Sequence, residues 1–314
     1  SADEQWLHWV ANEHGYSQHF MLDIVSEEIL SGPNWPHGVI QLEASSQQNV
    51  LAAFVESPTI PGDIWTWREG RNLPQRVTLS AHGGIDLSQC IEPTIEQFQT
   101  RDGLTLEGLL YYPEINDTIT APMVLQVHGG PTSQSRPEYE ALTQYLVQKG
   151  FAAFELNYRG STGYGKTFAR LNNQRQREDE LIDLEDAVKF LVTEGYAEPT
   201  QIAIMGGSYG GYLTMAAMTR LPSLFTCGVA SVGVSNWITA LEGAHPILKA
   251  SDRFEYGDIT DPENRAFFKS ISPIQYVENI EAPIMVLHGA NDPRDPVAES
   301  EDRKSTRLNS SHYS

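Results

Sequence analysis

The chain has 314 residues, of which 40% are hydrophobic and 20% charged, and its formal net charge is −20. This balance is typical of a globular protein, and the length exceeds that of one ordinary domain. So negative a charge argues against nucleic acid as a partner, and the apolar runs are too short to cross a bilayer. We therefore expect a globular protein with more than one domain and with neither a nucleic-acid nor a membrane partner.

Residues 1–88 carry short β-forming runs that are separated by turn-forming residues. The clearest runs are 6–11, 19–24, 49–55 and 63–67. Breakers lie between them, such as Gly32-Pro33 and Pro61-Gly62. This spacing of short strands is typical of the blades of a β-propeller. So short a stretch cannot close a propeller by itself.

From residue 95 onward, apolar runs of strand length alternate with helical patterns. The pattern predicts a hairpin over 95–112, strands over 122–127, 151–157, 226–232 and 283–289, and helices over 139–149 and 178–193. This alternation predicts a doubly wound, mostly parallel sheet with its functional site at the carboxyl ends of the strands. Five acidic residues of the second helix are interpreted as a solvated face: Asp179, Glu180, Asp183, Glu185 and Asp186.

The hexapeptide Gly206-Gly207-Ser208-Tyr209-Gly210-Gly211 is the most informative feature of the chain. It fits the pattern G-x-S-x-G and lies between an apolar run, 201–205, and a helix-prone run, 212–220. In this context the serine occupies a nucleophile elbow, a tight turn that lifts the hydroxyl above the sheet. Glycines are needed beside it because a Cβ would collide with strand or helix. Ser208 is the predicted nucleophile, and the N–H of Tyr209 is a predicted oxyanion donor.

A second oxyanion donor is predicted at the end of strand 122–127. His128-Gly129-Gly130-Pro131 follows that strand directly, and the backbone N–H of Gly129 or Gly130 would complete the oxyanion hole. The alternative is a tight turn capped by proline. His128 is interpreted as a hydrogen-bonded structural histidine, because the base of the triad should follow the acid in the sequence.

The acid of the triad is predicted just after strand 283–289. Asp292 stands where the acid orients its histidine, and Asp295 is the lesser candidate. The alternative is an aspartate that begins a turn before a proline. His288, at the end of the same strand, is interpreted as a structural histidine.

Two residues at other strand ends each have two interpretations. Arg159 is predicted either to contact a substrate or to form a structural ion pair, and Trp237 either to line a specificity pocket or to belong to the core. The two cysteines, Cys90 and Cys227, lie in separate regions and show no metal-binding or redox spacing. We therefore expect neither a cofactor nor a metal.

Four motifs together resemble the prolyl oligopeptidase family of serine peptidases, and within it the acylaminoacyl-peptidase and dipeptidyl-peptidase-like branch. They are HGGP at 128–131, NYRGSTGYG at 157–165, GGSYGG at 206–211 and HGANDPR at 288–294. The resemblance implies an α/β-hydrolase domain at 89–301, preceded by a β-propeller remnant at 1–88. It also implies acyl-enzyme hydrolysis of short peptides. The family usually has an apolar residue where Asp295 stands. The alternatives are an esterase or lipase on the same fold and a non-catalytic binding protein.

The final residues differ in character from the rest of the chain. The run from Asp302 to His312 resembles the translation of a common sequencing-library adapter, and it has one acidic and three basic residues. Such a segment is excluded from fold reasoning, so we treat 302–314 as an artefact. We expect the catalytic histidine beyond about Glu301 rather than at His312, and we expect the 314-residue chain itself to be nearly inactive. A cytoplasmic location is expected, and homo-oligomerisation is left open.

Overall fold

A computed structural model describes residues 5–44, 50–114, 120–244, 253–292, 297 and 300. The chain divides into two compact units. The N-terminal unit contains Ser1–Thr94 and Arg136–Lys149, and the C-terminal unit contains Ile95–Ser135 and Gly150–Ser314. The division at residue 88 that the sequence suggested stays a prediction.

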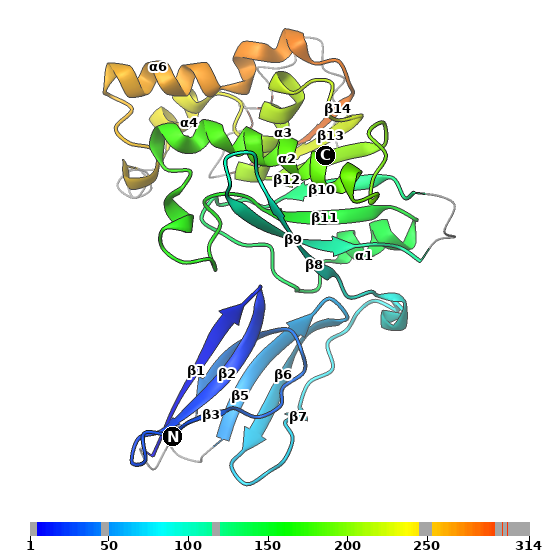
Figure 1. Cartoon of the computed structure of the whole chain (residues 1–314), viewed down its shortest axis with the longest axis vertical. Coiled ribbons are helices and arrows are strands. Elements are labelled where there is room, and N and C mark those ends of the chain that lie inside the picture. Colours follow the sequence, from blue (N-terminus) through cyan, green and yellow to red (C-terminus); the bar gives the residue numbers. More distant parts are fainter. Residues whose placement is uncertain are drawn as a thin grey trace. The chain divides into compact units, whose positions relative to one another are not determined.

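The N-terminal unit is built mainly from two antiparallel sheets (Figure 1). The first sheet contains β1 (Trp6–Glu13), β2 (Tyr16–Asp23) and β3 (Ile29–Ser31). The second contains β4 (Val39–Ala44), β5 (Val50–Ser57), β6 (Ile60–Arg68) and β7 (Gln75–Arg76). In β5 every second residue is buried, as expected for a strand with one face on a core. Three of these residues, Leu51, Ala53 and Val55, form a small core with Trp35 and Ile40. The predicted strands of this region are thus confirmed.

Two short helical segments complete this unit. They are the 3₁₀ helix η1 (Leu87–Gln89) and the α-helix α1 (Ala141–Gln148). The buried amide of Gln144 ties α1 to two loops, because it donates to the carbonyl oxygens of Pro58 and Ile91 and accepts from the N–H of Ile91.

The C-terminal unit is organised by a seven-stranded sheet in the order β14-β13-β12-β10-β11-β9-β8. Its strands are β8 (Thr94–Gln99), β9 (Thr105–Tyr111), β10 (Met123–Val127), β11 (Ala152–Asn157), β12 (Ile202–Gly207), β13 (Cys227–Ser231) and β14 (Ile284–Leu287). The strands from β14 to β11 are parallel, and β9 is antiparallel to β11. The predicted doubly wound, mostly parallel sheet is confirmed.

The strand order reverses at β10, which lies between β12 and β11 (Figure 1). In open α/β sheets such a switch point leaves a crevice outside the carboxyl ends of the strands, and ligands bind there. The chain leaves β10 through the HGGP segment and leaves β12 through the GGSYGG segment. The topology therefore places the HGGP and GGSYGG segments side by side at the carboxyl ends of neighbouring parallel strands.

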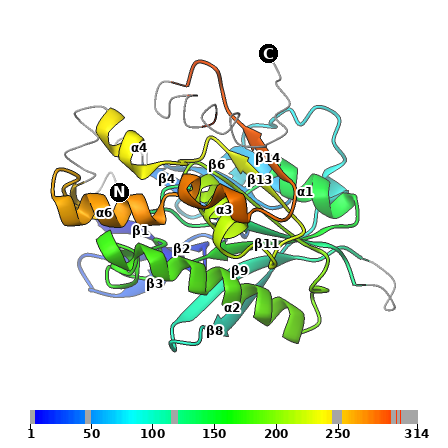
Figure 2. The ribbon, with the colours of Figure 1, turned by 90° about the horizontal axis from the view of Figure 1, so that it is seen from above.

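The described part of this unit also contains helices with defined bounds. They are α2 (Glu180–Thr193), α3 (Tyr209–Arg220), α4 (Trp237–Gly243) and α6 (Pro262–Ile271), with 3₁₀ segments η2 (Phe168–Arg170), η3 (Gln174–Asp179) and η4 (Pro273–Asn279). Helix α3 packs against β10, β12 and β13 (Figure 2), and its residues from Tyr209 to Thr219 are all buried. A helix that is buried all round belongs to the core of a domain, so the residue just before α3 has a rigid support.

The interpretation of the acidic side of α2 as a solvated face is wrong for three of its five residues. Glu180, Asp183 and Asp186 are 0%, 0% and 6% exposed. The carboxylates of Asp183 and Asp186 are paired with Arg159 and Arg101. Helical spacing alone did not reveal this, because both arginines belong to loops far away in the sequence.

Candidate active site

Ser208 occupies a strained backbone position between the end of β12 and the start of α3. Its φ and ψ angles are 54° and −119°, a conformation that costs a residue with a Cβ on the order of 1–3 kcal/mol. Two backbone hydrogen bonds hold it there. The N–H of Ser208 donates to the carbonyl oxygen of Ser231 (2.9 Å), and its carbonyl oxygen accepts from the N–H of Tyr212 (3.0 Å). This strand–turn–helix geometry is that of a nucleophile elbow.

The glycines of the elbow allow the helix to approach the sheet closely. A Cβ on Gly210 would lie 2.1 Å from the carbonyl oxygen of Val127, and one on Gly206 would lie 2.6 Å from the same atom. A Cβ on Gly211 would lie 2.7 Å from the carbonyl oxygen of Ser231. Because backbone atoms cannot yield to such contacts, these three positions require glycine. The expected collision of a Cβ with strand or helix does not occur at Gly207, where a Cβ would lie 3.9 Å from its nearest neighbour, the carbonyl oxygen of Ser231.

The HGGP segment lies directly beside the nucleophile. A Cβ on Gly129 would lie 3.4 Å from the Cβ of Ser208 and 3.1 Å from the carbonyl oxygen of Gly207. The next residue, Gly130, is exposed and has a φ of 122°, which favours glycine. Tyr209 is the first residue of α3, so its N–H belongs to the positive end of the helix dipole. The structure therefore places Gly129 beside Ser208, with Tyr209 next in the sequence, and the oxyanion hole itself stays a prediction.

The loop that follows β11 holds the HGGP segment through hydrogen bonds. The hydroxyl of Tyr158 donates to the carbonyl oxygen of His128 (2.9 Å), and the two ring nitrogens of His128 contact Ser161 Oγ (2.8 Å) and the carbonyl oxygen of Gly129 (2.7 Å). The side-chain amide of Asn157 bonds both backbone groups of Ser135. Burial lowers the pKa of His128 to about 4. His128 is thus a neutral, hydrogen-bonded structural residue at pH 7, as predicted.

Arg159 forms an ion pair in the interior of the C-terminal unit. Its backbone N–H (2.8 Å), Nε (2.9 Å) and Nη2 (2.7 Å) all donate to the carboxylate of Asp183, and Nη2 also reaches Asp102 (3.1 Å). The side chain of Arg159 is 5% exposed. Of the two roles that the sequence left open, the structure shows the ion pair, and a substrate contact by Arg159 is left without support.

Trp237 lies in a cluster of aromatic rings that includes Tyr209, the residue after the predicted nucleophile. It is 3% exposed, and its ring centroid lies 5.9 Å from that of Tyr209, 4.9 Å from that of Tyr212 and 5.1 Å from that of Tyr256. It therefore belongs to the core of the C-terminal unit, which is one of its two predicted roles. A contact of Trp237 with substrate stays a prediction.

A buried polar network around the side chain of Tyr209 was missed by sequence reasoning. The Tyr209 hydroxyl donates to Glu180 Oε2 (2.6 Å) and accepts from Nη1 of Arg177. Arg177 is 1% exposed, and its guanidinium carbon lies 4.3 Å from the ring centroid of Tyr256. Burial raises the pKa of Glu180 to about 7. No sequence signal points to this network, because Arg177 stands in a polar run that is typical of a surface segment.

The predicted acid, Asp292, follows β14 at the carboxyl edge of the sheet. Its backbone N–H donates to the carbonyl oxygen of Gly289 (3.2 Å). Nearby, His288 Nδ1 contacts Ser300 Oγ at 2.7 Å. Asp295, His312 and the segment 302–314 lie outside the described residues. Among the described residues, no group of three or more His, Cys, Asp or Glu side chains could hold a metal ion.

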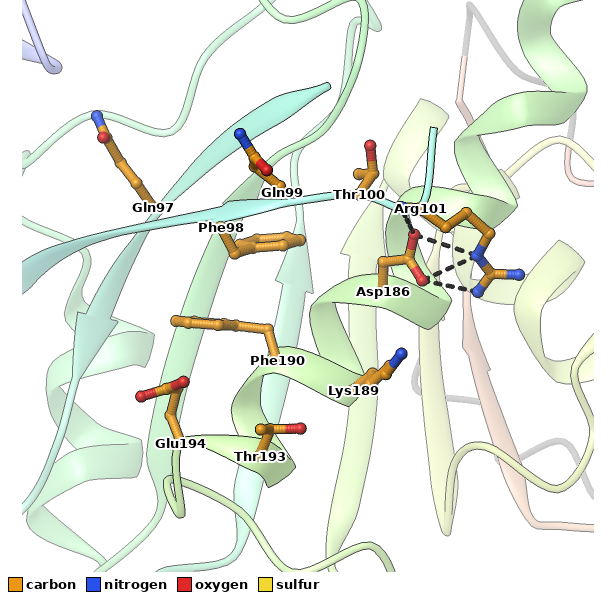
Figure 3. Close-up of a pocket in the computed structure, with 10 residues that line it drawn as sticks. All are labelled: Gln97, Phe98, Gln99, Thr100, Arg101, Asp186, Lys189, Phe190, Thr193 and Glu194. Atoms are coloured by element: carbon orange, nitrogen blue, oxygen red, sulfur yellow. Dashed lines mark hydrogen bonds and ion pairs between the residues drawn. The ribbon is translucent and has the colours of Figure 1, made fainter. Parts of the chain in front are cut away.

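A cavity of about 380 Å³ lies between β8 and α2 (Figure 3). Its lining includes the stacked rings of Phe98 and Phe190, whose centroids are 4.9 Å apart, and the ion pair of Arg101 and Asp186. Strand β8 is the edge strand of the sheet, and three strands separate it from β12, which carries the elbow. This cavity is therefore not part of the site around Ser208.

Comparison with known proteins gives consistent matches. The family model described as prolyl oligopeptidase family matches residues 137–304. The chain is 38% identical to dipeptidyl peptidase family member 6 of Caenorhabditis elegans over 84% of the chain, which corresponds to 40% of that protein.

Solved structures also match. A puromycin-hydrolyzing peptidase of Mycobacterium tuberculosis is 23% identical with a TM-score of 0.87, covering 98% of the chain and 48% of that structure. An acylaminoacyl peptidase in complex with Z-Gly-Gly-Phe-chloromethyl ketone is 26% identical with a TM-score of 0.81, covering 98% of the chain and 49% of that structure. The chain thus spans less than half the length of these proteins.

Proposed function

Because the chain belongs to the prolyl oligopeptidase family of serine peptidases, we propose that the whole protein hydrolyses short peptides through an acyl-enzyme on Ser208. Its fold is an α/β-hydrolase fold preceded by the last blades of a β-propeller. The observation that carries the proposal is the strained Ser208 at a strand–helix turn, with Gly129 beside its side chain. A backbone so strained is retained at a functional site, where it exposes the nucleophile.

The mechanism is acyl transfer. Ser208 Oγ attacks the substrate carbonyl carbon, and its proton passes to a histidine that Asp292 orients. The N–H of Tyr209 and that of Gly129 or Gly130 stabilise the negative oxygen of the tetrahedral intermediate. The leaving amine takes the proton from the histidine, and water then releases the acyl group through the same steps.

The substrate class is proposed from the relatives. Their names describe a dipeptidyl peptidase and an acylaminoacyl peptidase, and both kinds of enzyme act near the amino end of a peptide. We extend this to the present protein, whose substrates would be peptides with a free or acylated N-terminus. In the described part of the chain, no helix is both long and apolar enough to cross a membrane.

The test uses the whole protein that contains this chain. Anilides of acylated amino acids and of unblocked dipeptides are offered together with a simple p-nitrophenyl ester. Ser208→Ala should lower hydrolysis of the anilides by about 10⁴-fold or more. The matched control is Ser270→Ala, because Ser270 is exposed and its hydroxyl donates only to the carbonyl oxygen of Phe267. Cleavage of the ester alone would instead favour an esterase, and unchanged anilide hydrolysis in Ser208→Ala would refute the proposal.

A further inference from the structure

The protonation state of His128 follows from the atoms that face its ring. Nδ1 faces the carbonyl oxygen of Gly129 at 2.7 Å and the hydroxyl oxygen of Tyr158 at 3.4 Å. A carbonyl oxygen can only accept, and the Tyr158 hydroxyl donates its proton to the carbonyl oxygen of His128. Both neighbours of Nδ1 are therefore acceptors, which favours a hydrogen on Nδ1 over a lone pair.

The other ring nitrogen must then accept a hydrogen bond. Burial lowers the pKa of His128 to about 4, so near pH 7 the ring is neutral and has one N–H. With the hydrogen on Nδ1, Nε2 has a lone pair, and Ser161 Oγ lies 2.8 Å from it. The Ser161 hydroxyl can also donate to the carbonyl oxygen of Tyr158 (2.7 Å), which has two lone pairs and accepts the N–H of Ser161 (3.1 Å) with one of them. The single hydroxyl proton therefore has two competing acceptors. Donation to Nε2 satisfies more groups, because the Tyr158 oxygen keeps its bond from the N–H, whereas Ser161 Oγ is the one donor described at Nε2.

This hydrogen bond acts on the peptide group beside the nucleophile. The His128 Nδ1–H holds the carbonyl oxygen of Gly129, which belongs to the peptide bond between Gly129 and Gly130. That bond is trans, because the cis bond in this segment joins Gly130 to Pro131. In a trans peptide the C=O and N–H point in opposite directions. Holding the carbonyl towards the imidazole therefore directs the N–H of Gly130 away from the imidazole.

We infer that Ser161 is a positioning residue for the oxyanion hole: its hydroxyl fixes His128 as the Nδ1–H tautomer, and that tautomer orients the Gly130 N–H. The inference rests on the proposed function, and it selects Gly130 from the two glycines that the sequence left open. Ser161 is fully buried and belongs to the loop after β11, so it acts on the reaction through its neighbours and not by touching substrate. Without its hydroxyl, the ring is free to adopt the other tautomer, whose Nδ1 lone pair would repel the Gly129 oxygen.

The kinetic test is Ser161→Ala in the whole protein. Since losing an oxyanion donor outright costs about 10²–10³-fold in kcat, misorienting one should lower kcat by about 10-fold and leave KM within about twofold. His128→Asn is the second variant, because its side-chain amide can donate to the Gly129 oxygen without help from Ser161. The losses in kcat from Ser161→Ala and His128→Asn should not add in the double variant, as expected for residues that act through one another. The matched control is Thr219→Val, which removes a buried hydroxyl that donates to Met215 and does not contact His128.

A spectroscopic test separates this inference from the proposed function. Nitrogen NMR of the ¹⁵N-histidine-labelled whole protein at pH 7 reports the tautomer of His128 whether or not the protein turns over a substrate. We expect a protonated Nδ1 and an unprotonated Nε2 in the parent, and a mixture of tautomers in Ser161→Ala. A protonated Nε2 in the parent, or an unchanged kcat in Ser161→Ala, overturns the inference. If the parent shows the expected tautomer but no Ser208-dependent hydrolysis, the proposed function fails, and the positioning role fails with it.

Discussion

Helix α2 has two aspartates that bond an arginine in the same way but differ in burial. Asp183 accepts the backbone N–H, Nε and Nη2 of Arg159, and Asp186 accepts the same three groups of Arg101 (Figure 3). The aspartate side chains are 0% and 6% exposed, whereas the arginine side chains are 5% and 53% exposed. Replacing each aspartate by asparagine removes one negative charge and one of two acceptor oxygens, and it does so in the same way in both pairs.

The two substitutions should lower the free energy of unfolding by very different amounts. In Asp183→Asn the Arg159 guanidinium stays buried without its main counterion, and breaking a buried pair typically costs about 3–5 kcal/mol. Asp102, which also contacts Arg159, offsets part of the loss, so we expect about 3 kcal/mol. In Asp186→Asn the exposed Arg101 turns to water, and we expect about 1 kcal/mol, near the upper end for surface pairs.

Both decreases in the free energy of unfolding are measured by native-state hydrogen exchange of the whole protein, with mass spectrometry on peptides from α2. Burial raises the pKa of Asp183 to about 6, so the experiment is done at pH 8, where its carboxylate is ionised. Exchange should become about 150-fold faster in Asp183→Asn and about 5-fold faster in Asp186→Asn, at 1.36 kcal/mol for each factor of ten. Equal acceleration by the two variants would refute the argument that burial decides the value of the pair.

Three further predictions concern the site. Gly210→Ala should lower the free energy of unfolding of the C-terminal unit by about 2–3 kcal/mol, because its Cβ meets the carbonyl oxygen of Val127. Gly207→Ala should lower it by less than about 1 kcal/mol. Urea unfolding of both variants checks this, and equal midpoints would contradict it. The unfolded chain protonates His128 near its ordinary pKa of 6.5 and the folded chain only near 4, so this residue's contribution to stability is complete above pH 6.5 and is lost as the pH falls towards 4. His128→Asn should flatten the fall in melting temperature over that range, and an unchanged slope would exclude the effect. Tyr209→Phe should lower the free energy of unfolding by about 1–3 kcal/mol, because it removes the hydroxyl that bonds both the buried Glu180 and Arg177. Thermal melts of the variant test this. An unchanged melting temperature would show that the network does not contribute to stability.

Much of the fold could be predicted because its signals are local. The apolar runs that form β10, β11 and β12 are short and bounded by turn-forming residues. Their alternation with helical patterns predicts a mostly parallel sheet, which the structure has. The elbow around Ser208 could be predicted for the same reason. Its pattern, preceding strand and following helix occupy about twenty consecutive residues, and the required glycines reflect steric contacts that any such turn must make.

The unpredicted parts depend on contacts between residues that are distant in the sequence. The burial of Asp183 could not be read from the helix, because its partner Arg159 stands 24 residues away. Arg177 likewise lies 32 residues before Tyr209, and a polar run gives no sign that its guanidinium enters the core. The contact between His128 and the Gly129 carbonyl oxygen, on which the inference of Gly130 as oxyanion donor rests, likewise cannot be read from the sequence.

The most direct test of the central claim is covalent labelling of the whole protein with a fluorophosphonate, followed by mass spectrometry of the digested protein. Such reagents react with a serine whose hydroxyl is activated and whose oxyanion hole accepts the phosphoryl oxygen. The account predicts one adduct, on the peptide that contains Ser208, and its loss in Ser208→Ala together with anilide hydrolysis. Labelling of a different serine, or hydrolysis that persists in Ser208→Ala, would contradict it.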